Sequence, residues 1–411
     1  MRISAFIGYR PPDRLASQVA APPYDVISSD EARELAKGNP ISFLHVNKPE
    51  IDLDPSIDLY ADAVYETARK NLDRFIAEGV LAPDPRRCLY AYRQRMGSHV
   101  QLGLMCCAHV DDYDEDRIKK HEKTRQDKED DRARHVDVTN CNAGPVFLTY
   151  RARPEIDAPM RRATAKTPEV DFVSADGIQH TLWVISDPAL IGELIGGFAR
   201  IDVGYVADGH HRAKSGSRVR ALRRQANPKH TGVEEYNWFL TVYFPHDQLQ
   251  ILDYNRVVAD LNGLTEAQFL EKVQEKFDLS PAKTPKPPQP THFGMYLGGK
   301  WRRLVAKAGS YNAADPVQAL DVSILQNNLL DPILGIGDPR KDKRIDFVGG
   351  IRGAEELEKR VQSGKGAVAF AMHPTTLDQL MAISDAGQVM PPKSTWFEPK
   401  LKSGLVVHLL G

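Results

Sequence analysis

Five consecutive residues near the middle of the chain carry an unusual amount of polar chemistry. Asp208, Gly209, His210, His211 and Arg212 follow the apolar run "IDVGYVA". A helix that begins after such a run has unpaired backbone N–H groups and partial positive charge at its start, so it suits an anion. Imidazole and guanidinium groups donate hydrogen bonds to phosphate oxygens, and glycine lets the backbone approach closely. The block therefore predicts a phosphate or nucleotide site at a strand-to-helix junction.

Asp208 is the member of this block that needs a separate explanation. An acid beside an anion site repels phosphate unless it holds Mg²⁺ or accepts a proton from an attacking hydroxyl. Phosphoryl transfer needs both functions, so Asp208 is predicted as base or magnesium ligand. The alternative is that all these residues are structural. Asp208 would then cap the helix, the two histidines would bond within the protein, and Arg212 would form a salt bridge. A metal site on His210 and His211 is disfavoured, because neighbours on a helix point about 100° apart.

The elements around the block alternate between strand and helix patterns. An amphipathic helix is predicted over 59–78, and a hairpin that turns at Gly97 is predicted over 87–110. The block itself lies between a strand at 201–207 and a helix at 211–225, with a further strand near 236–244. Thr265 and Gln268 form a capping-box pattern ahead of another helix. This alternation predicts a mixed α/β fold.

The 411 residues exceed the usual size of one hydrophobic core, so two domains are expected. We predict an N-terminal α/β region over 1–255 and a C-terminal α/β region over 256–411 with a proline-rich loop at 280–290. Segment 111–137 contains 19 charged residues in 27 and is expected to be an insertion outside the core. The arginines after the block are expected on a solvated helix face; they are Arg218, Arg220, Arg223 and Arg224.

Composition narrows the class of protein. Apolar residues make up 42% and charged residues 27%, as in folded globular proteins. The net charge is -1, so no protein-wide positive field attracts DNA or an anionic membrane. We expect a cytoplasmic protein without a membrane segment, and a homo-oligomer stays open. The four cysteines have no CxxC spacing and are expected as buried thiols.

The segment "KHEKTR" offers a second acid for the same chemistry. It lacks the second histidine of a zinc-protease motif, because that position holds Arg125. We expect Glu122 to act as a second catalytic acid if the charged segment folds over the site as a lid. Its neighbours that would lie near phosphate are His121, Lys123 and Thr124. The structural alternative is a charged, solvated surface.

Residues in three other segments are candidates for contacts to an anion or substrate. Tyr24 and Asp25, in "APPYDV", are expected in a rigid turn, with the edge of a pocket as the alternative. Lys393, in "MPPKSTWF", follows two prolines and could contact an anion. Arg256 follows an apolar stretch, and a surface ion pair is expected there, with a phosphate contact as the alternative.

Motifs from across the chain together resemble the DUF1015 family of uncharacterised proteins. These motifs are "APPYDVIS", "HEKT", "DGIQHTLW", "ADGHHR" and "MPPKSTWFEPK" followed by "SGLV". The central block alone is similar to the ParB/sulfiredoxin superfamily, in which the corresponding junction binds nucleotide phosphates. The free-serine kinases of that superfamily carry the same Asp-Gly-His-His-Arg block. The resemblance implies a ParB/sulfiredoxin-like core that binds ATP or ADP with Mg²⁺.

Differences between this sequence and the motifs of these relatives exclude some of their activities. Sulfiredoxin has a cysteine where this chain has His210, so its thiol chemistry is excluded. Partition-type ParB proteins carry a helix-turn-helix that is not evident here, so DNA is not expected as a partner. The resemblance then implies transfer of a phosphoryl group between a nucleotide and a small hydroxyl metabolite, with free serine favoured. The alternative is a regulatory module that binds nucleotide or phosphate without turnover.

Overall fold

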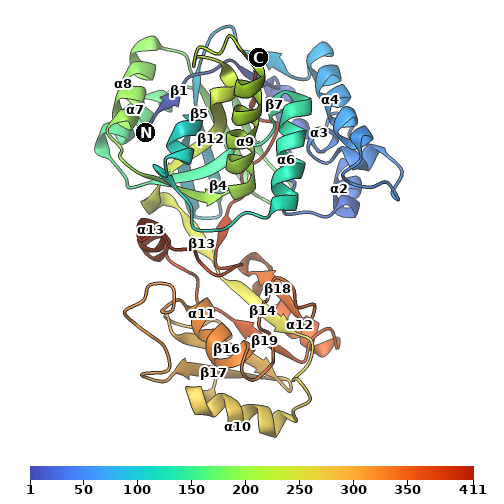
Figure 1. Ribbon diagram of the computed structural model, residues 1–411, viewed down its shortest axis with the longest axis vertical. Helices are drawn as coiled ribbons and strands as arrows, with labels where there is room; N and C mark the ends of the chain where they lie inside the picture. Colours follow the sequence, from blue (N-terminus) through green and yellow to red (C-terminus); the bar gives the residue numbers. More distant parts are fainter. The chain divides into compact units, whose positions relative to one another are not determined.

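A computed structural model describes residues 1–411, which form two compact units (Figure 1). Unit 1 comprises Met1–Leu249 together with Pro399–Gly411, and unit 2 comprises Gln250–Glu398. The chain therefore returns to unit 1 for its last residues. That 1–255 and 256–411 fold as separate domains stays a prediction. Both units combine helices and sheets, so the mixed α/β fold is confirmed. None of the helices combines the length and apolar character needed to cross a membrane.

Unit 1 is built on a nine-stranded mixed sheet. The order is β6 (Ile118–Lys119), β11 (Gly204–Asp208), β8 (Val146–Tyr150), β12 (Trp238–Pro245), β5 (His99–His109), β4 (Leu89–Met96), β10 (Gln179–Ile185) and β9 (Val170–Val173), with β1 (Ile3–Ser4) on β5. Strand β8 is buried along its whole length, which explains why its residues are apolar except for Thr149. A smaller sheet has the order β3 (Ala82–Pro83), β2 (Gly8–Arg10), β21 (Val407–Leu409) and β7 (Cys141–Asn142).

The helices of unit 1 pack against its sheets and against one another. They are α1 (Asp13–Val19), α2 (Ser29–Ala36), α3 (Leu44–Asn47), α4 (Asp62–Ala77), α5 (Val110–Asp114), α6 (Gln126–Thr139), α7 (Pro154–Ala163), α8 (Pro188–Ala199) and α9 (His210–Ala226). Helices α9 and α6 lie side by side, and α9 also contacts β8 and β12 (Figure 1). Ala213 and Val219 are the apolar residues of α9 that are fully buried. This packing fixes the start of α9 against the middle of the sheet.

Segment 111–137 contributes to the core, so its expected exclusion from the core is wrong. It supplies most of α5, strand β6 and most of α6, and Tyr113, Ile118 and Ala133 are buried. Its carboxylates pair with three of the four arginines that were expected on a solvated face of α9, and only Arg224 is exposed as expected. The pairs are Arg218–Asp130, Arg220–Asp111 and Arg223–Asp137. The high charge of this segment thus serves contacts between neighbouring elements of unit 1.

Unit 2 contains a six-stranded antiparallel sheet. The order is β15 (Phe277–Pro281), β17 (Lys300–Ala306), β16 (His292–Leu297), β19 (Val368–Ala371), β14 (Tyr254–Val258) and β18 (Ile345–Gly349), and β13 (Gln250–Leu252) pairs separately with β20 (Trp396–Glu398). Its helices are α10 (Glu266–Lys276), α11 (Asp321–Leu325), the π-helix η4 (Gln326–Leu330), α12 (Gly353–Gln362) and α13 (Leu377–Asp385).

Several local predictions are confirmed. Strands β4 and β5 form the hairpin expected over 87–110, and Thr265 makes the expected capping box with Gln268. All four cysteines are buried and free. The proline-rich loop is shorter than predicted, because Ser280 and Pro281 still pair with β17. These successes share a cause: each signal is encoded within about ten neighbouring residues.

Candidate functional site

The polar block lies at the strand-to-helix junction that the sequence predicted. Strand β11 ends at Asp208 and the 17-residue helix α9 begins at His210. The pairing of β11 with β8 is irregular between Val206 and Asp208, and such a bulge re-aims the side chains that follow it. Gly209 has φ 91°, which glycine adopts without strain, and a Cβ there would meet Arg212 Nε at 2.8 Å. The local backbone therefore requires glycine at this junction.

Asp208 is held in its ionised form by two cations. Its Oδ2 lies 3.2 Å from Lys400 Nζ and 3.7 Å from the Arg212 guanidinium. Its Oδ1 accepts the Gly209 N–H at 2.9 Å. Burial alone would raise the pKa of Asp208, but Lys400 and Arg212 outweigh it and hold this pKa well below the usual range. Such a carboxylate binds cations well and accepts protons poorly.

Arg212 connects the block to the N-terminal motif "APPYDV". Its guanidinium lies 3.8 Å from the carboxylate of Asp25 as well as near Asp208, and it donates to the Pro145 carbonyl. The two carboxylates raise the pKa of Arg212 against the opposite effect of burial. Its Nε is buried and has no hydrogen-bond partner. One N–H of this arginine is therefore still available to an acceptor.

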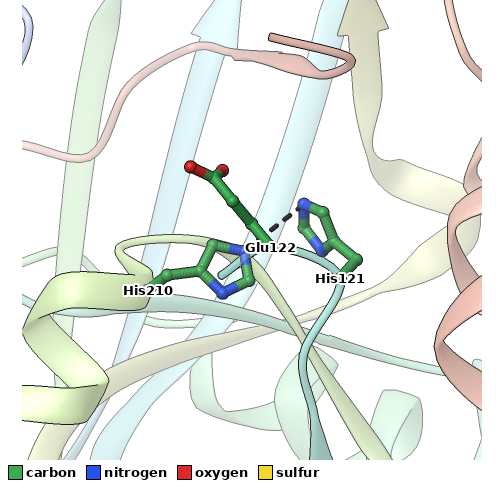
Figure 2. A group of neighbouring side chains, drawn as sticks. All are labelled: His121, Glu122 and His210. Atoms are coloured by element: carbon green, nitrogen blue, oxygen red, sulfur yellow. Dashed lines mark hydrogen bonds between the residues drawn. The ribbon is translucent and has the colours of Figure 1, made fainter. Parts of the chain in front are cut away.

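The first histidine of the block faces a histidine from the charged segment. His210 Nε2 lies 3.3 Å from His121 Nε2, and the rings meet edge to face (Figure 2). Burial lowers the pKa of His121 to about 4 and that of His210 further below the ordinary histidine value. Both rings are therefore neutral at pH 7, and one donates a hydrogen bond to the other. His210 can donate to a phosphate only as a neutral imidazole.

Glu122 lies near the block because the short strand β6, which ends three residues before it, pairs with β11. Strand β6 runs parallel to β11 with Ile118 opposite Gly204. Glu122 and Asp208 each follow four residues later, so both lie at the same edge of the sheet. Ligand atoms of His121, Glu122 and His210 lie within 4.8 Å of one another. Figure 2 shows the two rings nearest each other and the Glu122 carboxylate farther out. Two imidazoles and one carboxylate are donors that suit Zn²⁺ or a similar transition metal, whereas Mg²⁺ prefers oxygen donors alone.

The remaining predicted residues differ in burial and in the contacts that they make. His211 is half-buried, and its Nε2 accepts the backbone N–H of Arg125 at 3.1 Å. Tyr24 stacks under Arg132 at 4.3 Å, and burial raises its pKa. Thr124 donates to Glu129, and Lys123 is exposed. In unit 2, the ammonium of Lys393 lies 5.6 Å from the ring centre of Tyr254.

A small cavity adjoins Arg212 on the side of helix α6. Its volume is about 30 Å³, and Tyr24, Arg132, Arg212 and Ser215 contribute to its walls. This volume accommodates one or two waters and no nucleotide. A nucleotide at this site would therefore have to lie on the solvent side of the block, where Glu122 is exposed.

Lys400 was not predicted as a site residue. It contacts Asp208 from the segment that returns to unit 1, far along the sequence. It is the last residue of "MPPKSTWFEPK", one of the motifs that carry the resemblance, and that position is the only signal in the sequence. No local pattern indicates that this segment returns to β11, because the contact depends on the topology of the whole unit.

The family model for DUF1015, described as a protein of unknown function, matches residues 3–323 of the 411. The chain belongs to the DUF1015 family. This match covers all of the block, the charged segment and the "APPYDV" motif. No curated protein matches the chain.

Solved structures similar to the chain include three proteins with low identity. A free serine kinase in complex with AMP is 12% identical, with 73% of this chain and 91% of that chain covered at a TM-score of 0.36. A conserved hypothetical protein from Pyrococcus furiosus is 12% identical, with 75% and 95% covered at 0.35. SbnI with a C-terminal truncation from Staphylococcus aureus is 12% identical, with 74% and 87% covered at 0.37. Likenesses at these TM-scores carry no weight for the chemistry of the site.

Proposed function

We propose that this protein transfers a phosphoryl group between a nucleotide, ATP or ADP, and a small hydroxyl metabolite, with free serine the first acceptor to test. One observation carries the proposal. A second carboxylate, Glu122, lies beside the Asp-Gly-His-His-Arg block at the start of α9. Phosphoryl transfer requires cationic and N–H donors for phosphate together with a base for the attacking hydroxyl. The core would be of the ParB/sulfiredoxin type that the block resembles.

The phosphate would lie against the start of α9. The backbone N–H groups of its first turn have no intrahelical partner, and the helix dipole favours negative charge there. Arg212 and Lys400 supply positive charge within reach of the same carboxylate, Asp208. His210 and His211 would donate as neutral rings. These groups together would orient the phosphate rather than react with it.

Glu122 is the better candidate for the catalytic base. The cations beside Asp208 lower its pKa and weaken it as a proton acceptor. In the proposed step the acceptor hydroxyl gives its proton to Glu122 while its oxygen bonds to phosphorus. The bond from that phosphorus to the leaving nucleotide oxygen breaks at the same time, so charge and atoms balance.

Magnesium fits this site through oxygen donors. Asp208 offers a carboxylate beside the start of α9, and one carboxylate together with nucleotide phosphates is a usual Mg²⁺ environment; the phosphate oxygens would then take over the contacts with Lys400 and Arg212. Asp208 would hold the ion, and Mg²⁺ would neutralise the phosphate charge. Gly209 would keep the carboxylate oriented through its N–H bond to Oδ1.

The direct test is product formation. Purified protein is incubated with ATP or ADP, Mg²⁺ and serine, and phosphoserine is measured by mass spectrometry. We expect product with the natural sequence and none with Glu122→Gln. Glu115→Gln is a matched control, because it removes an exposed carboxylate from the same segment. Phosphoserine formation by Glu122→Gln at the rate of the natural sequence would remove Glu122 from the mechanism.

The regulatory alternative has its own support. Asp208 is already neutralised by Lys400 and Arg212, an arrangement that serves binding as well as catalysis. Nucleotide binding that is lost in Arg212→Met, without any phosphorylated product across a panel of hydroxyl metabolites, would favour a binding module. Transfer to any member of the panel would favour the enzyme.

A further inference from the structure

A buried arginine in unit 2 lacks a countercharge. Arg256 lies in β14, between β19 and β18, and is 4% exposed. It was expected in a surface ion pair, and that expectation is wrong. Its guanidinium donates to the carbonyls of Tyr254 and Lys393 and lies 5.3 Å from the ring centre of Phe347. No carboxylate lies within ion-pair distance of it.

This arrangement is unusual for a buried charge. Charged side chains in protein interiors are normally paired, because desolvation costs several kcal/mol per ion. Carbonyl oxygens accept hydrogen bonds from a guanidinium but leave its net charge uncompensated. Burial lowers the pKa of Arg256 only to about 10, so it stays protonated at pH 7. A bound anion would supply the missing charge.

A cavity of about 420 Å³ opens onto Arg256. This volume lies within the range of small-molecule sites. Its apolar walls are Val322, Leu330, Ile345, Phe347, Pro391 and Pro392. Gln326 and Leu330 come from the π-helix η4, an element that occurs often at functional sites.

The rim of this cavity is electrically neutral. Arg340 and Asp338 both line it, and the Arg340 guanidinium binds both oxygens of that carboxylate at 2.9–3.0 Å. Each of these two charges therefore compensates the other. Arg256 is left as the one uncompensated charge among the lining residues. The cavity thus combines an apolar body with a single cationic end.

We propose that this cavity binds a small organic anion, a carboxylate or phosphate monoester attached to an apolar group, with its oxygens on Arg256. The apolar group would lie against Phe347 and the two prolines of "MPPKSTWF". A guanidinium matches both headgroups, because each presents two coplanar oxygens to its fork. This site lies wholly within unit 2, so it is independent of the phosphoryl transfer proposed for unit 1.

The probes separate the headgroup from the apolar body. Binding to the full chain is measured by calorimetry and thermal unfolding with phenyl phosphate, phenylacetate and the neutral phenylacetamide. We expect at least one of the two anions to bind and to raise Tm, while the amide does neither. The anion that binds more tightly identifies the headgroup. Failure of both anions, or equal binding of the amide, would overturn the proposal.

Two variants test the location. Arg256→Met should weaken anion binding by about 10- to 100-fold, the value of a charge-assisted hydrogen bond. Gly337→Phe should block the cavity without touching the arginine. Gly337 lines the cavity, and a Cβ there meets only Asp331 Oδ1, at an ordinary 3.7 Å. If Arg256→Met does not fold, Gly337→Phe alone decides the outcome.

Two control variants complete the experiment. Arg303→Met removes another arginine of unit 2 that bonds only backbone carbonyls, and it should bind the probes normally. Asp208→Asn removes the carboxylate of the unit 1 site and should also bind normally. Binding that survives Gly337→Phe, or that Asp208→Asn abolishes, belongs elsewhere and would overturn the proposal. A failure here leaves the phosphoserine assay of unit 1 unaffected.

Discussion

The two units treat buried arginines in opposite ways. In unit 1, Arg212 lies within 3.8 Å of two carboxylates, those of Asp25 and Asp208. In unit 2, Arg256 bonds only backbone carbonyls beside a large cavity. The first arginine has its countercharge within the protein, so a ligand there must compete for it. The second has none, so an anionic ligand gains the full interaction.

Two aspartates, one partly buried in unit 1 and one buried in unit 2, differ in the same way. Lys400 and Arg212 hold the pKa of Asp208 low against burial. Asp321 in unit 2 is 8% exposed, and its Oδ1 accepts a hydrogen bond from the Thr291 N–H at 2.8 Å. Burial raises the pKa of Asp321 to about 7. The carboxylate of Asp208 in unit 1 is thus neutralised by two cations, whereas that of Asp321 in unit 2 has no countercharge.

Catalysis should show the largest effect. Asp208 is paired with two cations and accepts protons poorly, so Glu122 is the expected general base. Glu122→Gln should therefore lower kcat by about 10²- to 10⁴-fold, the range for the loss of a general base. Asp208→Asn should instead raise KM for the magnesium nucleotide more than it lowers kcat. Steady-state kinetics with the serine assay separates the two. A large fall in kcat for Asp208→Asn, with Glu122→Gln unaffected, would exchange their roles.

Asp321→Asn should stabilise unit 2 at high pH. The pKa of Asp321 is about 7 in the folded protein and 3.8 in the unfolded chain. Its contribution to the free energy of unfolding is therefore fully present below pH 4 and is lost as the pH rises to 7. The amide keeps the acceptor for Thr291 and removes the charge, so unfolding should cost about 4 kcal/mol more at pH 8. Urea titrations at pH 8 and pH 4 check this, with Asp278→Asn as the exposed control. An equal gain at both pH values would contradict a buried charge.

Asp208→Ala should destabilise unit 1 by about 2 kcal/mol. It leaves Lys400 and Arg212 without the carboxylate that they share, and breaking a partly buried pair costs about this much. Denaturant unfolding at pH 7 measures the loss. The double variant Asp208→Ala/Lys400→Met should recover part of it, because one cation less is unpaired. Additive losses in the double variant would argue against a shared network.

Much of the fold could be predicted from short-range patterns. Burial periodicity and capping located the hairpin β4–β5, helix α10 and the junction between β11 and α9. The same reasoning failed for segment 111–137. Composition shows that a segment is charged but not which residues it pairs with, and its partners are arginines on α9 that lie 86 to 109 residues away along the chain.

The site could be predicted only where its residues are contiguous. Asp208 to Arg212 form one motif, but the approach of Glu122 depends on the two-residue strand β6. Lys400 arrives through the return of 399–411 to unit 1. Arg256 was misassigned, because a sequence shows a charge but neither its burial nor the absence of a carboxylate around it.

Acid should act on the buried groups of the two units in opposite directions. Protonation removes the solitary charge of Asp321, whereas in unit 1 it would place a charge on His135 beside Arg132. Burial, with Arg132, lowers the pKa of His135 to about 4, so its contribution is present above pH 6.5 and lost as pH falls toward 4. His135 bonds the Val46 carbonyl at 2.8 Å, and glutamine at this position keeps an N–H donor. When the pH falls from 6.5 to 5.5, His135→Gln should therefore lose about 1 kcal/mol less of its free energy of unfolding than the natural sequence. Parallel stability curves for His135→Gln and the natural sequence would mean that His135 is not buried as a neutral ring.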